Sequence, residues 1–242
     1  MNTNYRKKIY PEYASRMQDA SPVFNKNEAV RWGKAYDTYL RGWLPDRKNA
    51  AVLDVGCGGG NLLYFFRSRE YRNVKGIDIS HEQINLARQV HDDVVETDNI
   101  KFLESQENKY DLIIGLDIVE HYQKDEVLRF LEACYNALNS GGCLILQTPN
   151  AESPWGTHHR YHDFTHEIGF NPNSLKRLIS LVGLSDIEFR EAGPVVHGIV
   201  SLLRYLIWKV IHICLLLWNL VETGSKGSGI YTRVFLIKGK KI

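Results

Sequence analysis

The stretch Leu53-Asp54-Val55-Gly56-Cys57-Gly58-Gly59-Gly60-Asn61 decides the fold class. It joins a short apolar run to a helical pattern, and its glycines let the backbone turn tightly and approach a ligand closely. It is not a dinucleotide fingerprint, because Asn61 stands where a third glycine is needed and Asp54 would repel a pyrophosphate. We therefore expect a pocket for a nucleotide-like ligand that carries a positive centre.

Outward from this turn, β-branched runs alternate with amphipathic helical patterns. The strand-like runs lie at 51–55, 74–79, 99–103, 111–116, 142–148, 185–191 and 231–238. The helical patterns lie at 61–69, 82–91, 124–137 and 175–182. This alternation is typical of βαβ units, so we expect an α/β fold with a mostly parallel sheet and helices on both faces.

Three regions of different composition predict the domain organisation. Residues 1–45 are aromatic and charged, with helical spacing between 26 and 40, and are expected to form an N-terminal helical cap. Residues 46–194 together with 230–242 form the expected α/β core. Residues 195–229 are an apolar helical insertion before the last strand.

The composition limits which binding partners and which cellular compartment are expected for this protein. The net charge of +2 supplies no basic surface for nucleic acid, so none is expected as a partner. The four cysteines show neither zinc spacing nor a disulfide pattern, which favours reduced thiols. The N-terminal stretch has no apolar run of the kind found in a secretory signal, so we expect a cytoplasmic protein.

Two more acidic residues follow the expected strands of the pocket. Asp78 ends the second strand, where its carboxylate can accept both hydroxyls of a ribose. Asp98 lies in the third-strand region, where a carboxylate can accept from an adenine amino group. The spacing thus predicts an adenosine-binding edge.

The chain resembles the class I S-adenosylmethionine-dependent methyltransferases over residues 50–190. The segments that carry the resemblance are LDVGCGGG, GIDIS, the step Thr97-Asp98, YDLIIGLDIVEH and SGGCLILQTPN. It implies a Rossmann-like seven-stranded sheet with an antiparallel last strand, and S-adenosylmethionine as cofactor. It also implies cofactor-binding roles: the methionine end for Asp54, Gly56 and Gly58, the ribose and adenine for Asp78 and Ile79, and the adenine for Asp98.

Arg16 in the segment YASRM is a further candidate of the N-terminal cap. If the cap folds over the cofactor, its guanidinium can pair with the methionine carboxylate. The alternative is a solvated residue on the surface of the cap.

Two loops rich in carboxylate and imidazole groups are expected beside the methyl donor. Asp117-Ile118-Val119-Glu120-His121 follows the fourth strand, and residues 155–167, after the fifth strand, hold four of the nine histidines. Methyl transfer to a hydroxyl requires loss of its proton, which a neutral imidazole or a bound metal ion promotes. We expect His121, His166 and Asp117 to be the catalytic candidates.

The two loops look like those of plant small-RNA ribose methyltransferases and ubiquinone-pathway O-methyltransferases, which bind a divalent ion. The resemblance implies Asp117, Glu120, His121 and His166 as ligands, with His162 as an alternative to His166. Such a mixture of oxygen and imidazole ligands suits Mg²⁺, Mn²⁺ or Fe²⁺. A metal-free histidine base and purely structural histidines are the alternatives.

The apolar stretch 197–221 is interrupted by Arg204, Lys209 and His212. One interpretation is a helix that lies on the inner face of a membrane, with the cations reaching the head groups. The other is a helical hairpin that packs on the core or on a second subunit of a homodimer.

The whole pattern, including RYHDFTHE and ETGSKGSGIYTRVF, looks like methyltransferases associated with bacterial surface-polysaccharide (O-antigen or capsule) synthesis. That resemblance implies O-methylation of a sugar hydroxyl on a nucleotide- or lipid-linked glycan. The alternatives are a small-molecule or quinone-pathway O-methyltransferase and a cofactor-binding scaffold without turnover.

Overall fold

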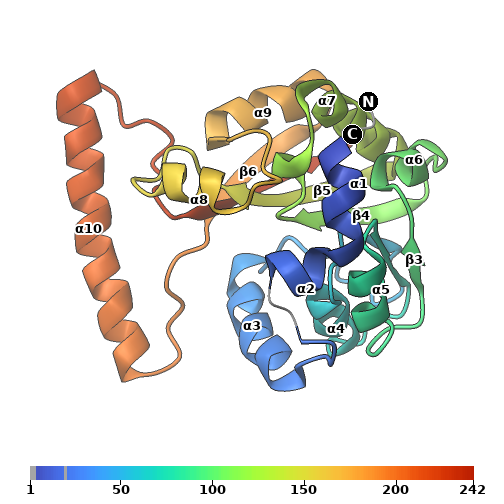
Figure 1. Ribbon diagram of the computed structural model, residues 1–242. Helices are drawn as coiled ribbons and strands as arrows, with labels where there is room; N and C mark the ends of the chain where they lie inside the picture. Colours follow the sequence, from blue (N-terminus) through green and yellow to red (C-terminus); the bar gives the residue numbers. More distant parts are fainter. Residues whose placement is uncertain (1–3, 19–20) are drawn as a thin grey trace.

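The computed structural model describes residues 4–18 and 21–242, which form one sheet of seven strands covered by helices (Figure 1). The strands are β1 (Val52–Val55), β2 (Val74–Asp78), β3 (Val94–Glu96), β4 (Tyr110–Leu116), β5 (Leu138–Pro149), β6 (Ser185–Glu191) and β7 (Val234–Lys240). Their order is β3-β2-β1-β4-β5-β7-β6. β7 pairs antiparallel with β5 and β6, and the other pairs are parallel. The predicted Rossmann-like α/β fold is confirmed.

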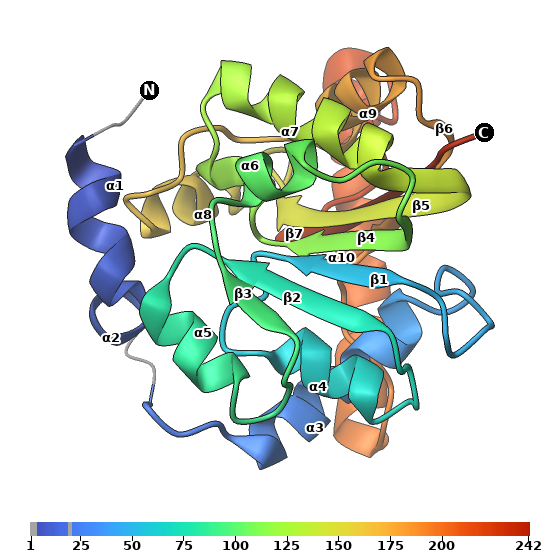
Figure 2. The same cartoon turned by 90° about the vertical axis from the view of Figure 1, so that its right-hand side faces the viewer.

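Helices cover both faces of this sheet (Figure 2). On one face lie α6 (Asn99–Glu104), α7 (Lys124–Ala137) and α9 (Pro172–Leu181), and on the other lie α3 (Lys26–Tyr39), α4 (Asn61–Arg67) and α5 (His81–Ala87). Phe130 and Leu175 pack in the apolar core of the first face, and Tyr36 and Leu63 pack in that of the second. The sheet therefore separates two cores.

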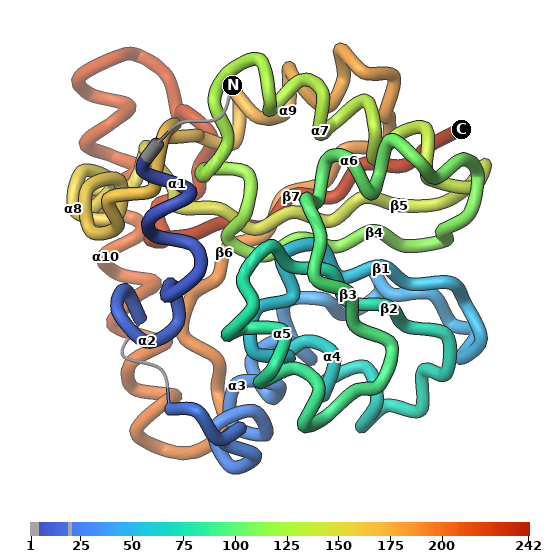
Figure 3. Tube along the Cα trace, turned by 45° about the vertical axis from the view of Figure 1, so that its right-hand side comes forward, coloured from blue at the N-terminus to red at the C-terminus, as the bar shows by residue number. Residues whose placement is uncertain are grey.

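Most of the remaining helical segments lie near the edge of the sheet at which β4 and β5 end: α1 (Asn4–Ile9), η1 (Tyr10–Glu12), α2 (Tyr13–Met17), η2 (Val119–His121) and α8 (Gly156–His162). The helix α10 (Ile199–Thr223) instead lies beside the sheet, on the side of its last strand β6. Residues 4–18, termed the N-terminal segment, run beside α8 and α5 (Figure 3). The predicted cap thus comprises this segment and α3.

The predicted third strand at 99–103 is wrong. The third strand is β3, a few residues earlier, and residues 99–104 form the helix α6. The reason is Asp98, whose Oδ1 accepts hydrogen bonds from the backbone amides of Ile100 and Lys101, both at 3.1 Å. A side-chain oxygen in this position satisfies amides that have no partner in the first turn, so a helix begins there.

The insertion contains one continuous helix, α10, and no hairpin. The stretch has no glycine or proline between residues 199 and 223 to interrupt it, and Gly224 ends it in a left-handed conformation with φ 71°. Figure 1 shows α10 beside the rest of the molecule, joined to it by the connections 192–198 and 224–233. Among the described residues it is the one helix long and apolar enough to cross a membrane.

Gly60 gives a test of the glycine turn at the start of α4. It has φ 92°, and an added Cβ would lie 2.9 Å from Val90 Cγ2 and 3.0 Å from Ala87 Cα. We expect Gly60→Ala to lower the free energy of unfolding by about 2–4 kcal/mol, because backbone strain and steric overlap add.

Gly141 is the matched control, since it has φ 78° and no atom within 4 Å of an added Cβ. Gly141→Ala should cost only the backbone strain, about 1–2 kcal/mol. Urea denaturation measures both variants, and equal losses would contradict the close packing of the turn on α5.

Candidate active site

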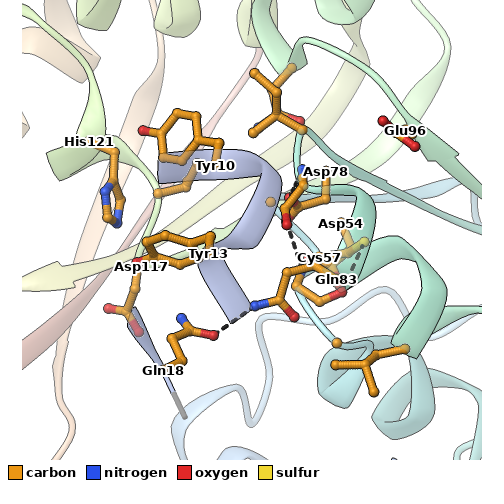
Figure 4. A pocket seen from close by; sticks show the side chains of 18 of the residues that line it. Tyr10, Tyr13, Gln18, Asp54, Cys57, Asp78, Gln83, Glu96, Asp117 and His121 are labelled. Carbon is orange, nitrogen blue, oxygen red and sulfur yellow. Dashed lines mark hydrogen bonds between the residues drawn. The ribbon is translucent and has the colours of Figure 1, made fainter. Parts of the chain in front are cut away.

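A cavity of about 1140 Å³ opens at the carboxyl ends of β1, β2 and β4, where loops of parallel strands meet at one edge of the sheet. The N-terminal segment supplies the opposite wall (Figure 4). Eight of the predicted site residues line it: Asp54, Gly56, Gly58, Asp78, Ile79, Asp98, Asp117 and His121.

The cavity has two ends, which Figure 4 shows from close by. Asp54 and Asp78 lie at one end, termed the cofactor end. Asp117 and His121 lie at the other, termed the acceptor end. The strand order therefore separates the residues predicted for the cofactor from those predicted for the chemistry.

Asp54 is the most deeply buried acid of the cofactor end. It is 2% exposed, and among the described residues its Oδ2 has no hydrogen-bond partner. Burial raises its pKa, and the neighbouring charge of Asp78 raises it further. A buried carboxylate without a partner costs free energy, which a cationic donor in the cavity would offset. The ammonium group of S-adenosylmethionine is such a donor, so the residues fit this cofactor.

Asp78 holds the glycine turn closed. Its Oδ2 accepts from the amide of Gly58 at 2.9 Å, and its Oδ1 accepts from the amide of Ser80 at 2.8 Å. Burial raises the pKa of Asp78, and these backbone hydrogen bonds oppose the rise. Each oxygen keeps a second lone pair, which leaves acceptors for the two hydroxyls of a ribose.

Ile79 and Asp98 complete the cofactor end. Ile79 is 43% exposed and lines the cavity, so it offers an apolar surface to a flat ring. Asp98 uses Oδ1 to cap α6, and among the described residues no hydrogen bond engages its Oδ2. That oxygen is left to accept from an amino group.

Sequence reasoning did not assign the wall formed by the N-terminal segment. Tyr10, Tyr13 and Gln18 line the cavity, and Gln18 Oε1 accepts from Gln83 Nε2 of α5 at 2.7 Å. The two tyrosines lie three residues apart, a spacing that places them on one helical face. A cap folded over the cofactor is one expectation from the sequence, but with Arg16 in this role and not Tyr10, Tyr13 or Gln18.

Polar contacts hold the N-terminal segment on the acceptor end. Arg6 donates to Glu126 Oε1 and to the carbonyl oxygen of His121, both at 2.7 Å. Tyr13 donates to Asp163 Oδ2 at 2.5 Å. Although burial opposes it, the hydrogen bonds of Arg6 to Tyr5 and Glu126 raise the pKa of its guanidinium. The segment is therefore anchored by a charged group that sequence reasoning missed.

Arg16 does not join the other predicted site residues. Its side chain is 71% exposed and pairs with Glu12 one turn away. The cationic residues of the N-terminal segment that line the cavity are Arg6 and Lys7.

Glu120, His121 and His166 form a compact cluster, termed the triad, beside the acceptor end. Their ligand atoms all lie within 4.8 Å of one another, and His166 Nε2 lies 4.0 Å from Glu120 Oε1. Backbone pairing brings them together, since the amides of Glu167 and Ile168 donate to the carbonyl oxygen of Glu120. Of the three, His121 also lines the cavity.

Hydrogen bonds fix the protonation of both imidazoles. His166 Nδ1 lies 2.9 Å from the carbonyl oxygen of His159, which can only accept, so this nitrogen carries the proton. His121 Nδ1 lies 2.8 Å from Thr165 Oγ1, whose own proton is donated to Asp163 at 2.7 Å. Both Nε2 atoms are therefore left as acceptors, which is the arrangement of histidines that bind metal ions.

Glu120 supplies the third acceptor of the triad. It is 1% exposed, its Oε2 accepts from Thr148 Oγ1 at 2.9 Å, and its Oε1 has no partner among the described residues. Burial raises its pKa well above the usual value, and the charge of Asp117 adds to this. Burial and the neighbouring His166 lower the pKa of His121 to about 4. Three acceptors without a donor between them fit a divalent cation.

Two candidates from the sequence lie outside the triad. Asp117 has φ 54°, and its Oδ2 accepts from Gln147 Nε2 at 2.8 Å instead of facing Glu120. Loss of hydration raises the pKa of Asp117 to about 6, and the hydrogen bond from Gln147 opposes this rise. His162 is exposed and stacks on His158, with ring centroids 5.4 Å apart. The cluster thus contains His166 and not His162, and it lacks Asp117.

Comparison with known proteins identifies the class. Residues 24–188 match the family described as "Methyltransferase domain". This match covers more than half of the chain, and the chain belongs to that family. The predicted class is thereby confirmed.

Solved structures share the fold. A SAM-dependent methyltransferase from Archaeoglobus fulgidus has a TM-score of 0.65 at 20% identity, covering 95% of this chain and 98% of that one. Geranyl diphosphate C-methyltransferase from Streptomyces coelicolor has a TM-score of 0.66 at 14% identity, covering 100% of both chains. At these identities the similarity concerns the fold alone.

Curated relatives include ubiquinone biosynthesis O-methyltransferases. That of Saccharomyces cerevisiae is 34% identical over 117 residues, which are 45% of this chain and 36% of that protein. That of Xanthomonas campestris pv. campestris is 32% identical over 139 residues, which are 48% and 56%. The chain thus matches about half or less of the length of these relatives. They lend no support to the polysaccharide association expected from the sequence.

A binding measurement tests the cofactor end. We expect Asp78→Asn to weaken binding of S-adenosylhomocysteine about tenfold or more, because a lost hydrogen bond to a charged acceptor costs about 1.5–3 kcal/mol. Arg16→Ala is the control and should bind normally. Titration calorimetry measures both, and an equal loss in Arg16→Ala would instead support the carboxylate contact expected from the sequence.

A second titration tests the triad with Mn²⁺ as the probe. The wild type should bind one ion, and Glu120→Gln or His166→Asn should abolish this binding, whereas His162→Asn should not change it. Affinity should fall as the pH falls, because the raised pKa of Glu120 lets its carboxyl protonate at a higher pH than usual. Retained binding of S-adenosylhomocysteine shows that each variant is folded. Unchanged Mn²⁺ affinity in Glu120→Gln would rule out the site.

Proposed function

We propose that this protein is an S-adenosylmethionine-dependent O-methyltransferase whose acceptor is a phenolic hydroxyl of a small molecule. The observation that carries the proposal is the triad beside the cofactor cavity, with two imidazole acceptors and one unpaired carboxylate oxygen. A hydroxyl acceptor must lose its proton, whereas a scaffold without turnover has no use for such a cluster.

The donor set favours assistance by a metal ion over a free histidine base. The pKa of His121, lowered to about 4, makes its imidazole a weak base for a phenol, whose pKa is about 10. A divalent cation held by Glu120, His121 and His166 would lower the pKa of a hydroxyl bound to it. Thr165 and the carbonyl oxygen of His159 orient the two imidazoles for this role.

Residues of the chain also position the two substrates. Asp54 and Asp78 at the cofactor end supply acceptors for the ammonium and ribose groups of the methyl donor. At the acceptor end, Tyr13 packs edge-on against His121, with ring centroids 6.3 Å apart, and Tyr10 lies beside it in the cavity wall. Aromatic walls suit a planar phenol, which stacks or packs edge-on against them.

The acceptor class is supported by the relatives. The curated relatives named above are O-methyltransferases of ubiquinone biosynthesis. We therefore favour a catechol-like acceptor over the sugar hydroxyl implied by the sequence resemblance to polysaccharide enzymes.

A methyl-transfer screen tests this function. Catechols with and without an apolar tail, sugar nucleotides and lipid-linked glycans are incubated with labelled S-adenosylmethionine. We expect transfer to catechols, loss of activity with chelator, recovery with Mg²⁺ or Mn²⁺, and a loss of about 100-fold in Glu120→Gln, in the range of single-group catalytic effects. Transfer to sugars alone would contradict the phenolic acceptor. Full activity in the presence of chelator would show that methyl transfer requires no metal ion.

A further inference from the structure

The helix α10 turns a side of mixed polarity toward the domain and its most apolar side away from it. Its less exposed positions recur every three or four residues, and they are Ser201, Tyr205, Trp208, His212, Leu215, Leu216 and Asn219. His212 Nε2 lies 2.9 Å from both Glu191 Oε1 and the carbonyl oxygen of Gly229. A helix of a soluble domain normally buries its apolar stripe, so α10 has the reverse arrangement.

The opposite side of α10 is an apolar surface, termed the outer ridge. It consists of Ile199, Leu203, Leu206, Ile207, Val210, Ile213, Leu217 and Val221, each more than half exposed. With 25 residues the helix is about 37 Å long, so the ridge is a continuous apolar surface and not a set of isolated exposed side chains. Such a surface needs an apolar partner.

The charged residues of α10 border the ridge. At 3.6 residues per turn, Arg204 and Lys209 fall on opposite flanks of the helix, between the ridge and the side that faces the domain. The ammonium group of Lys209, half-exposed, also lies 3.9 Å from Glu191 Oε2 of the domain. Trp218 lies on the same flank as Arg204, is 67% exposed, and donates from Nε1 to Glu222 at 2.9 Å. Cations and an indole at the borders of an apolar face match the levels of head groups and acyl chains at a membrane surface.

The connections of α10 exclude a crossing of the bilayer. The strands before and after it, β6 and β7, pair directly, with Glu191 opposite Phe235. If α10 crossed about 30 Å of hydrocarbon, residues 224–233 would have to return through it. Ten extended residues reach at most about 35 Å, and their backbone groups would have no partners there. A helix in the plane of one leaflet meets neither difficulty.

The width of the ridge favours lipid over a second copy of the chain. Apolar residues at 199, 203, 206, 210, 213, 217 and 220 have the spacing of a coiled-coil seam. The positions beside this seam on one side, Val200, Ile207, Cys214 and Val221, are all apolar and exposed. On the other side lie Leu202, Lys209 and Leu216, so a single charged residue flanks the seam. Charged residues normally occupy these positions and select the partner helix, so the broad face is less suited to a two-stranded pair.

We propose that α10 lies in the plane of an anionic membrane leaflet, with the outer ridge among the acyl chains and Arg204 and Lys209 at the phosphates. β6 is the last strand of the sheet and is followed by α10, which lies on this side of the molecule. Docking through α10 therefore places the β6 side of the sheet against the membrane.

Vesicle sedimentation of the full chain tests this surface. The protein should bind vesicles of phosphatidylcholine with 30% phosphatidylglycerol, and bind pure phosphatidylcholine more weakly. The double variant Leu206→Glu/Ile213→Glu should lower the partition coefficient at least tenfold, because two ridge side chains no longer enter the acyl region. Arg204→Gln should reduce binding to the anionic vesicles about fivefold, corresponding to about 1 kcal/mol per cation.

Leu181→Glu is the matched control, because Leu181 is 72% exposed on α9, away from the ridge. It should bind vesicles like the wild type, and all variants should bind S-adenosylhomocysteine normally. If the protein bound neither kind of vesicle, the proposal would be wrong. So would a dimer, seen by sedimentation velocity without lipid, that the double variant converts to monomers, because the ridge would then be covered by a second copy.

Discussion

The burial of two carboxylates without cationic partners is the constraint on which this site depends. Asp54 at the end of β1 and Glu120 after β4 are almost fully buried, and each keeps one oxygen without a partner among the described residues. A soluble fold has no structural reason to keep such groups, since a charge that is neither paired nor hydrated costs several kcal/mol. Both oxygens lie at or beside the cavity, where positive ligands would offset the cost: the ammonium group of the methyl donor at one end and the proposed metal ion at the other.

A single chain of hydrogen bonds connects the N-terminal segment with the chemistry. Tyr13 donates to Asp163, which also accepts from Thr165, and Thr165 in turn fixes the proton of His121 on Nδ1. Burial raises the pKa of Asp163, but the hydrogen bonds that it accepts from Tyr13 and Thr165 outweigh this effect. The pKa of Asp163 is therefore lowered. The segment that closes the cavity thus also orients an acceptor atom at its far end. The N-terminal segment therefore contacts both ends of the cavity, through Gln18 at Gln83 and through Tyr13 at Asp163.

The sheet and the cofactor end were predictable from sequence because both rest on local patterns. Glycines after an apolar run and acids at the ends of strands have few other interpretations, and parallel pairing brings them together. The third strand was misplaced because apolar periodicity does not separate a short strand from a helix that Asp98 caps. The roles of Arg6 and Tyr13 depend on how residues 4–18 fold across the sheet, a long-range contact that leaves no local pattern. The family resemblance implied Asp117 as a fourth metal ligand, but its left-handed backbone turns the side chain toward Gln147.

The same reasoning applies to the surface of α10, where an exposed apolar ridge requires a partner as an unpaired carboxylate does.

The central claim about the site is tested most directly by the protons released on binding. Calorimetry at pH 6 in buffers of different ionisation enthalpy measures this release for S-adenosylmethionine and for Mn²⁺. The raised pKa values of Asp54 and Glu120 predict that each ligand displaces protons, and that Asp54→Asn and Glu120→Gln abolish the respective release. Binding of both ligands without proton release would contradict the account.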